Sequence, residues 1–173
     1  EVSTQLSRYL TAHHQVTVND VVGIRQYRSE WMLITVLGIL KAGAAYVPID
    51  PDYPEERLEY IRQDSAYRVC IDEAELAHFR AVRDQYPVTP FSTEISPAGP
   101  AYAIYTSGST GKPKGVLNHH AGLMNRLLWM RDYLGITPHT VVLQKTPYTF
   151  DVSVWELLLP AICGAQLLFA KPD

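Results

Sequence analysis

The sequence has little of what marks several specialised classes of protein. Its 173 residues include only two cysteines, Cys70 and Cys163, and each lies in an apolar run. This number excludes a disulfide-rich scaffold, so we expect reduced thiols in the core rather than a disulfide or a metal site. No apolar run reaches the roughly 18 residues that a membrane span needs, and no signal-peptide pattern opens the chain. These absences predict a cytoplasmic protein that makes no membrane contact.

A large excess of either charge is also missing. The chain has 15 Lys and Arg against 18 Asp and Glu, a net charge of −3, which gives no overall field for nucleic acid or an anionic membrane. Residues 95–131 are the exception, because they contain four basic residues and no acidic one, while the remainder has 11 basic and 18 acidic residues. Any polyanion must therefore bind locally, and this basic stretch is the expected place.

The composition, with 47% apolar and 19% charged residues, is that of a globular protein with one domain or a domain and a half. Short apolar runs alternate with helical patterns along nearly the whole chain. This order predicts an α/β fold, with layers of parallel β-sheet flanked by helices and joined by right-handed crossovers. Strands are expected at 21–24, 45–49, 67–71, 101–106, 115–119, 141–145 and 165–170. Helices are expected at 2–13, between Ser29 and Gly43, at 54–65, 73–85, 119–135 and 151–164, the last interrupted near Pro160.

One connection and two apolar stripes complete this outline. Residues 87–100 contain four prolines, so we expect a connection there and a boundary between two sub-units. Four apolar residues at helical spacing should fill one face of the second helix, and four more should face the core from the fifth. The first stripe is Trp31, Ile34, Leu37 and Leu40, and the second is Leu123, Leu127, Met130 and Leu134.

The most informative segment is YTSGSTGKPKGV, residues 105–116. Its glycines allow backbone N–H groups to turn toward one point, and its hydroxyls and lysines add donors and positive charge. Such a loop suits an oligophosphate, although a flexible polar turn can have the same composition. It is not a Walker A loop, because only two residues separate Gly108 from Gly111 and a proline follows Lys112. The candidate phosphate-binding residues are Thr106, Ser107, Gly108, Ser109, Thr110, Gly111, Lys112 and Lys114.

This segment resembles the phosphate-loop motif of the adenylate-forming enzymes, and in particular that of nonribosomal peptide synthetase adenylation domains. LKAGAAYVPIDPDYPEERL, residues 40–58, resembles the preceding motif of that family, and FDVSVWE, residues 150–156, resembles the following one. The resemblance runs over residues 1–173, which correspond to less than half of such a domain. It therefore implies part of the large N-terminal subdomain of an adenylate-forming enzyme.

The resemblance also implies a reaction. An amino acid attacks ATP to give an aminoacyl-adenylate and pyrophosphate, and the acyl group then passes to the phosphopantetheine thiol of a carrier protein domain. The loop would hold the β- and γ-phosphates together with Mg²⁺, and no metal ligand is predicted within the chain. The lysine that contacts the substrate carboxylate and the α-phosphate would lie beyond residue 173. The elements that bind adenine, ribose and Mg²⁺ would also lie there. The chain alone should therefore be inactive, and its partners would be the remainder of the adenylation domain, the carrier domain and a small activating protein.

Residues of the third motif are implied to contact the substrate. Asp151 would meet the α-ammonium, Phe150 would wall the pocket, and Val152 and Trp155 would line the space for the side chain. The combination of Asp151, Val152 and Trp155 resembles that of serine-activating domains. By itself, Asp151 could equally be an ordinary helix N-cap, and Trp155 could be core packing. Residues 145–150 are expected to approach the reacting groups.

Other readings remain open. Another kind of adenylate-forming ligase, an acyl-CoA ligase or an aryl-acid ligase, would share the loop but would not need Asp151. A truncated subdomain without catalytic activity is a further alternative. His119 and His120 are expected at a helix start or beside a phosphate, because adjacent helical residues point about 100° apart and suit a metal poorly. The charged residues of 54–64 are expected to form a solvated face.

Overall fold

The computed structural model describes residues 1–107 and 112–171. The helices in these ranges are α1 (Val2–His13), α2 (Glu30–Lys41), α3 (Glu55–Ser65), α4 (Glu73–Val82), α5 (His120–Leu134) and α6 (Val152–Cys163), with a 3-10 turn at Arg83–Gln85. The strands are β1 (Val21–Ile24), β2 (Ala45–Pro48), β3 (Val69–Ile71), β4 (Pro100–Thr106), β5 (Lys114–His119), β6 (Val141–Gln144) and β7 (Gln166–Phe169). Each strand predicted from the sequence is present, with ends that shift by two residues or fewer.

The described strands form two sheets. The larger has the order β3-β1-β2-β4-β5, and the smaller contains β6 and β7. Four strands of the larger sheet are mutually parallel, as are the two strands of the smaller one, which confirms the predicted α/β class. Strand β5 departs from the prediction of parallel strands, because it pairs antiparallel with β4. Only seven residues separate these two strands, which is too few for a parallel crossover, so the pair forms a hairpin.

The two faces of the larger sheet pack against different helices. Tyr46 and Tyr102 point into the main hydrophobic cluster, which also receives side chains from α1, α2, α5 and α6. Their alternate neighbours Val47, Ala103 and Tyr105 point to the other face, where they pack with residues of α3. This alternation is the period of two expected of strands buried on both faces. The helix α3 therefore covers the face beneath the end of β4.

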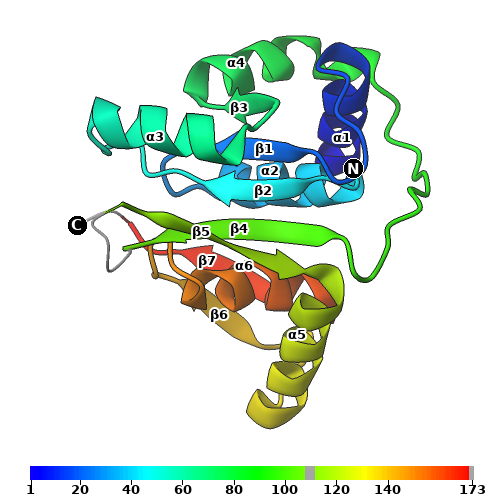
Figure 1. Ribbon diagram of the computed structural model, residues 1–173. Helices are drawn as coiled ribbons and strands as arrows, with labels where there is room; N and C mark the ends of the chain where they lie inside the picture. Colours follow the sequence, from blue (N-terminus) through cyan, green and yellow to red (C-terminus); the bar gives the residue numbers. More distant parts are fainter. Residues whose placement is uncertain (108–111, 172–173) are drawn as a thin grey trace.

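The hairpin of β4 and β5 lies between two groups of elements (Figure 1). In that view α1 to α4 and β1 to β3 lie on one side of it, while α5, α6, β6 and β7 lie on the other. Residues 87–99 form no helix or strand and run along the outside from the 3-10 turn to β4. The predicted connection is therefore present. The main hydrophobic cluster continues across both groups of elements, and a boundary between sub-units near 87–100 stays a prediction.

The buried face of α2 differs from the predicted one. The apolar residues Met32, Val36 and Ile39 are fully buried, whereas the predicted stripe from Trp31 to Leu40 is half-buried at the margin of the cluster. The close approach of α1 accounts for this shift, because a Cβ atom on Gly38 would lie only 2.8 Å from a methyl carbon of Leu6. Contact with both α1 and the sheet selects a face that the hydrophobic spacing alone did not single out.

Two later helices also differ in detail. Leu123, Leu127 and Met130 are buried as predicted, but Leu134, the last residue of α5, is 44% exposed. The helix α6 continues through Pro160 for three more residues instead of breaking there. Its end comes at Gly164, which has a φ of +67° and a left-handed conformation. This is a common way for a helix to stop.

The cysteines are unpaired, and no helix within residues 1–107 and 112–171 has both the length and the apolar character needed to cross a bilayer. Cys70 and Cys163 are half-buried at the margin of the hydrophobic clusters rather than inside them. Burial raises the pKa of the Cys70 thiol to about 12. The thiol is therefore protonated at neutral pH and is a poor nucleophile.

Candidate functional site: a basic hairpin and a cavity beside Asp151

The hairpin places four of the predicted phosphate-binding residues at one end of the sheet. Thr106 pairs with Lys114 as the last partners of β4 and β5. Thr106, Ser107, Lys112 and Lys114 are all exposed there. Their hydroxyl and ammonium groups could donate to an anion outside the hairpin. The other four predicted members, Gly108, Ser109, Thr110 and Gly111, lie outside the described residues.

This end of the hairpin coincides with the carboxyl ends of parallel strands. Strands β1, β2 and β4 run in the same direction, so Ile24, Pro48 and Thr106 end at the same edge of the sheet. Ligands of open α/β sheets bind outside the carboxyl ends of the strands. The basic hairpin therefore lies at the edge of the sheet where ligands of this fold class bind.

Helix α3 contacts both strands of the hairpin near the loop. The phenol of Tyr60 donates a hydrogen bond to the carbonyl oxygen of Pro113 at 3.0 Å. The phenol of Tyr105 donates to Asp64 Oδ2 at 2.6 Å. Sequence reasoning assigned the charged residues of this helix, Asp64 among them, to a solvated face and missed both contacts. The available signal was that Tyr60 and Asp64 are four residues apart, which puts both on one side of a helix.

A buried carboxylate organises the segment before α6. Glu156 accepts hydrogen bonds from the backbone N–H groups of Lys145 at 3.1 Å and Thr146 at 3.0 Å. It also accepts from the hydroxyl of Thr146 at 2.6 Å and the side-chain amide of Gln144 at 3.2 Å. These four donors offset the cost of burying a charged group. Glu156 therefore fixes the backbone where residues 145–150 begin.

Tyr148 attaches the same segment to the main sheet. Its hydroxyl lies 3.0 Å from the carbonyl oxygen of Ile24 and also contacts that of Ile49. It accepts a hydrogen bond from the backbone N–H of Gln26 at 3.1 Å. Burial raises the pKa of Tyr148, so the hydroxyl keeps its proton and donates it to one carbonyl at a time. Residues 145–150 are thereby held across the carboxyl ends of β1 and β2, at the same edge of the sheet as the basic hairpin.

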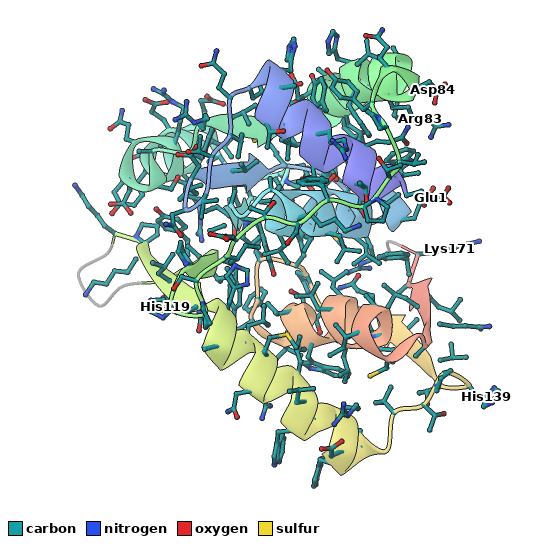
Figure 2. The ribbon with its side chains drawn as sticks, turned by 90° about the vertical axis from the view of Figure 1, so that its right-hand side faces the viewer. Glu1, Arg83, Asp84, His119, His139 and Lys171 are labelled. Atoms are coloured by element: carbon teal, nitrogen blue, oxygen red, sulfur yellow. The ribbon has the colours of Figure 1, made fainter. Side chains whose placement is uncertain are left out.

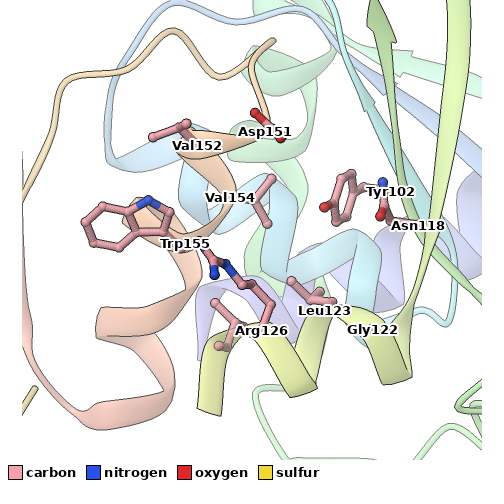
Figure 3. Close-up of a pocket in the computed structure, with 10 residues that line it drawn as sticks. Tyr102, Asn118, Gly122, Leu123, Arg126, Asp151, Val152, Val154 and Trp155 are labelled. Carbon is pink, nitrogen blue, oxygen red and sulfur yellow. The ribbon is translucent and has the colours of Figure 1, made fainter. Parts of the chain in front are cut away.

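A cavity of about 260 Å³ lies between β4, β5, α5 and α6. It is lined by three of the four predicted substrate-binding residues, Asp151, Val152 and Trp155 (Figure 3). Asp151 lies on one side of this cavity and Arg126 on the other. The remaining lining residues are Tyr102, Asn118, Gly122, Leu123, Leu127 and Val154. Sequence reasoning missed Tyr102 and Asn118, which line this cavity together with Asp151 because the hairpin lies beside α5.

Asp151 stands at the N-cap position of α6 but does not act as a cap. Its φ of −61° and ψ of −28° are already helical, and no capping hydrogen bond joins its side chain to the described backbone of α6. Burial, and then the charge of Asp151, raise the pKa of Tyr102. Asp151 is exposed and lines the same cavity as Tyr102, so it lies on the cavity side of the sheet. The N-cap alternative for Asp151 is not met by the geometry.

The structure does not bring Phe150 to this cavity. Its side chain is 60% exposed, and it is absent from the described residues that line the cavity. The backbone N–H of Phe150 donates to the carbonyl of Pro147 at 3.0 Å, and this turn directs the chain outward just before α6. Phe150 therefore lies outside this cavity among the described residues, and its role as a wall of the substrate pocket stays a prediction.

The two adjacent histidines lie at a helix start. His119 is exposed where β5 meets α5 (Figure 2), and burial lowers the pKa of His120.

Within the described ranges, no group of three His, Cys, Asp or Glu residues is arranged to hold a metal. The described hairpin residues offer hydroxyls and ammonium groups, which suit a phosphate, whereas Mg²⁺ prefers carboxylate and other oxygen ligands.

Comparison with known proteins agrees with these features. Residues 1–173 match the family described as AMP-binding enzyme. The chain is 43% identical over 182 residues to tyrocidine synthase 3 of Brevibacillus parabrevis, a match that covers 99% of this chain and 3% of the relative. This chain therefore spans a small part of that relative's length.

Two solved structures are similar to this chain in both fold and sequence. The N-terminal subdomain of Klebsiella oxytoca NpsA, in complex with 3-hydroxyanthranilyl-AMSN, has a TM-score of 0.86 at 28% identity over 100% of this chain and 46% of that one. A four-domain nonribosomal peptide synthetase bound to AMP and glycine has a TM-score of 0.78 at 34% identity, over 99% of this chain and 13% of that one.

The family match covers the whole chain, and the fold is that of an N-terminal subdomain of adenylate-forming enzymes. These findings confirm the family that the three sequence motifs indicated. The chain belongs to the AMP-binding enzyme family, within which it corresponds to the N-terminal portion of a nonribosomal peptide synthetase adenylation domain.

Proposed function

We propose that the larger enzyme containing this chain activates an amino acid with ATP. A carboxylate oxygen of the amino acid attacks the α-phosphorus of ATP, the bond from that phosphorus to the bridging oxygen breaks, and pyrophosphate leaves with the bonding electrons. The products are an aminoacyl-adenylate and pyrophosphate. The phosphopantetheine thiol of a carrier protein domain then loses its proton and attacks the acyl carbon, which forms a thioester and releases AMP.

The basic hairpin supplies electrostatic stabilisation to this step. Negative charge accumulates on the β- and γ-phosphates as pyrophosphate departs, and fixed donors at that place lower the barrier. Thr106, Ser107, Lys112 and Lys114 are exposed together at the end of β4 and β5. Gly108, Ser109, Thr110 and Gly111 complete the proposed phosphate site. Mg²⁺ bound with ATP supplies further charge neutralisation, from ligands outside the described residues.

The single observation that carries the amino-acid assignment is the carboxylate of Asp151 at the cavity. It is free of a capping role and lies on the side opposite Arg126. Asp151 is exposed in this chain. A substrate α-ammonium would pair with it when the remaining elements of the domain enclose the site, whereas an acid without an amine would offer the carboxylate no cation. The related synthetase structure bound to AMP and glycine supports this choice. The NpsA subdomain, bound to a 3-hydroxyanthranilyl compound, represents the aryl-acid alternative.

Val152 and Trp155 line the same cavity as Asp151 and are proposed to contact the substrate side chain. Their combination with Asp151 favours serine as the substrate. The phenol of Tyr102 and the amide of Asn118 also line the cavity, and they could hydrogen-bond a hydroxyl group. The proposed partners of the chain are the remainder of the adenylation domain, a carrier domain and a small activating protein.

The test is ATP/pyrophosphate exchange by the complete enzyme with three sets of acids. These sets are proteinogenic amino acids, aryl acids such as 3-hydroxyanthranilate, and fatty acids. Exchange that depends on an amino acid, with serine the best, is the expected result. Exchange supported best by an aryl or fatty acid would replace this function with that of another adenylate-forming ligase. Exchange with none of the acids, although the enzyme is folded, would favour a non-catalytic role.

A further inference from the structure

Helix α3 and the basic hairpin are joined by two polar contacts that packing alone does not require. Ile61, on the same helix, is fully buried and packs with Val47 and Ala103 beneath the sheet. Apolar contact therefore already docks α3. Tyr60 and Asp64, on either side of Ile61, instead extend toward the end of the hairpin from which the phosphate-binding residues project.

We propose that Tyr60 and Asp64 are positioning residues that hold the two strands of the basic hairpin in the geometry that binds the phosphates of ATP. The inference rests on the proposed role of the hairpin in binding ATP. It assigns a function to two residues that follow, by two and six positions, the segment at 40–58 that resembles the preceding family motif. Neither side chain is proposed to touch the substrate.

The first contact fixes the start of β5. Proline has no backbone N–H, so the carbonyl oxygen is the only backbone hydrogen-bonding group of Pro113. That oxygen accepts from Tyr60 at 3.0 Å. The peptide bond between Pro113 and Lys114 is thereby oriented, and with it the direction in which Lys114 leaves the strand.

The ring of Tyr60 also lies near Lys112, the residue directly before Pro113. The ammonium nitrogen of Lys112 lies 6.0 Å from the centroid of the ring, at the outer limit of a cation–π interaction. A long lysine side chain has many accessible rotamers, and a ring beneath its ammonium group favours those that stay near the hairpin. Tyr60 therefore acts on both lysines, one through the backbone and one through its ring.

The second contact fixes the end of β4. Tyr105 pairs across the hairpin with Gly115, and a Cβ atom at that position would lie 3.1 Å from Cζ of Tyr105 and 3.3 Å from its hydroxyl oxygen. The phenol therefore crosses the bare Cα of Gly115 to donate to Asp64 at 2.6 Å. Burial, and then the hydrogen bond to Asp64, raise the pKa of Tyr105. The phenol is accordingly a donor at neutral pH.

The experiment uses the complete adenylation domain, with the Michaelis constants for MgATP and for the substrate acid measured separately. Tyr60→Phe keeps the ring and removes the hydroxyl, while Asp64→Ala removes the acceptor of Tyr105. Each variant should raise the Michaelis constant for MgATP about threefold to tenfold, the range for loss of one hydrogen bond. The Michaelis constant for the acid should change less than about twofold, which is less than the loss of one hydrogen bond typically causes.

Two further variants separate positioning from folding. Asp64→Asn retains an oxygen that accepts from Tyr105, so it should restore most of the MgATP affinity lost in Asp64→Ala. Arg62→Gln changes the exposed Arg62–Glu59 pair of the same helix and should leave both constants unchanged. Unaltered MgATP constants in the double variant Tyr60→Phe/Asp64→Ala would overturn the proposal. Equal increases in both constants, accompanied by a lower melting temperature, would do the same, because they indicate a structural role alone.

The test is independent of the identity of the acid. The dissociation constant of MgATP, measured by calorimetry without any acid, should rise in Tyr60→Phe and Asp64→Ala by the same factors. If the complete enzyme prefers an aryl acid, the proposed amino-acid activation fails while this comparison still supports the positioning role. Equal MgATP dissociation constants in the wild type and these variants would contradict the positioning role whichever acid is used.

Discussion

The carboxylate of Glu156 holds Thr146 twice, by accepting from its backbone N–H at 3.0 Å and from its hydroxyl at 2.6 Å. Glu156 lies in the first half of α6, and Thr146 belongs to the segment that crosses the carboxyl ends of β1 and β2. The segment and the helix that begins at Asp151 are therefore linked through a buried ion. The position of Asp151 depends on this link.

Glu156→Ala should lower the free energy of unfolding of the complete adenylation domain by about 3 kcal/mol, because it leaves buried donors without an acceptor. Glu156→Gln keeps one acceptor oxygen and should lose less. Urea denaturation of both variants measures the difference. A loss below about 1 kcal/mol in Glu156→Ala, less than one unsatisfied buried donor costs, would contradict the link.

Lys112→Ala and Lys114→Ala should weaken the use of ATP rather than folding. Removing one donor to developing charge typically lowers the rate by about 100-fold to 1000-fold, and these exposed lysines are expected near the low end of that range. The measurement is ATP/pyrophosphate exchange as a function of MgATP, with melting temperatures for comparison. Arg131→Gln is the matched control, because Arg131 lies in the same basic stretch but pairs with Asp132 on the exposed face of α5. Equal losses in all three variants would indicate a general charge effect instead of a phosphate site.

Cys70 should resist alkylation although it is only half-buried. Burial raises its pKa to about 12, so at pH 8 the thiolate fraction should be about 1000-fold lower than that of a thiol with the ordinary pKa near 8.5 to 9. Labelling by iodoacetamide in a Cys163→Ser background, followed by mass spectrometry, measures this rate. The rate should keep rising with pH beyond 9. A plateau at pH 9 would show an ordinary thiol.

The isolated chain, residues 1–173, should show no ATP/pyrophosphate exchange above background. In the proposed reaction, the lysine that contacts the substrate carboxylate and the α-phosphate comes from elements beyond residue 173. The groups that hold adenine, ribose and Mg²⁺ also come from those elements. The chain covers 46% of the related NpsA subdomain, which agrees with this account. Exchange by the isolated chain would mean that those elements are not needed.

The features that the sequence revealed are those determined by local patterns. The runs VVGI and VVLQ are short, apolar and bounded by polar residues, and both form the expected strands β1 and β6. The family resemblance, rather than spacing, placed Asp151, Val152 and Trp155 at one pocket, and all three line one cavity. Helical periodicity and strand alternation require no knowledge of distant contacts.

What the sequence left hidden depends on tertiary contacts. Tyr60 and Asp64 lie among charged residues, and only the docking of α3 beneath β4 shows that they face the hairpin. The prediction of which face of α2 is buried was wrong, because α1 approaches so closely at Gly38. The antiparallel direction of β5 was also missed, although the seven residues between Thr106 and Lys114 are too few for a parallel crossover and were a signal available in the sequence.

The central claim is that Asp151 selects substrates that carry an α-ammonium group. The most direct measurement is the specificity of exchange, as kcat/KM, for L-serine relative to 3-hydroxypropanoate, which lacks only the amine. Asp151 is exposed in this chain. The wild-type enzyme should favour serine by at least about 100-fold, because a carboxylate left without its partner costs several kcal/mol once the remaining elements of the domain enclose the substrate. Asp151→Ala should reduce this preference to within about tenfold, mainly by losing activity on serine. An unchanged preference in a folded Asp151→Ala enzyme would contradict the account.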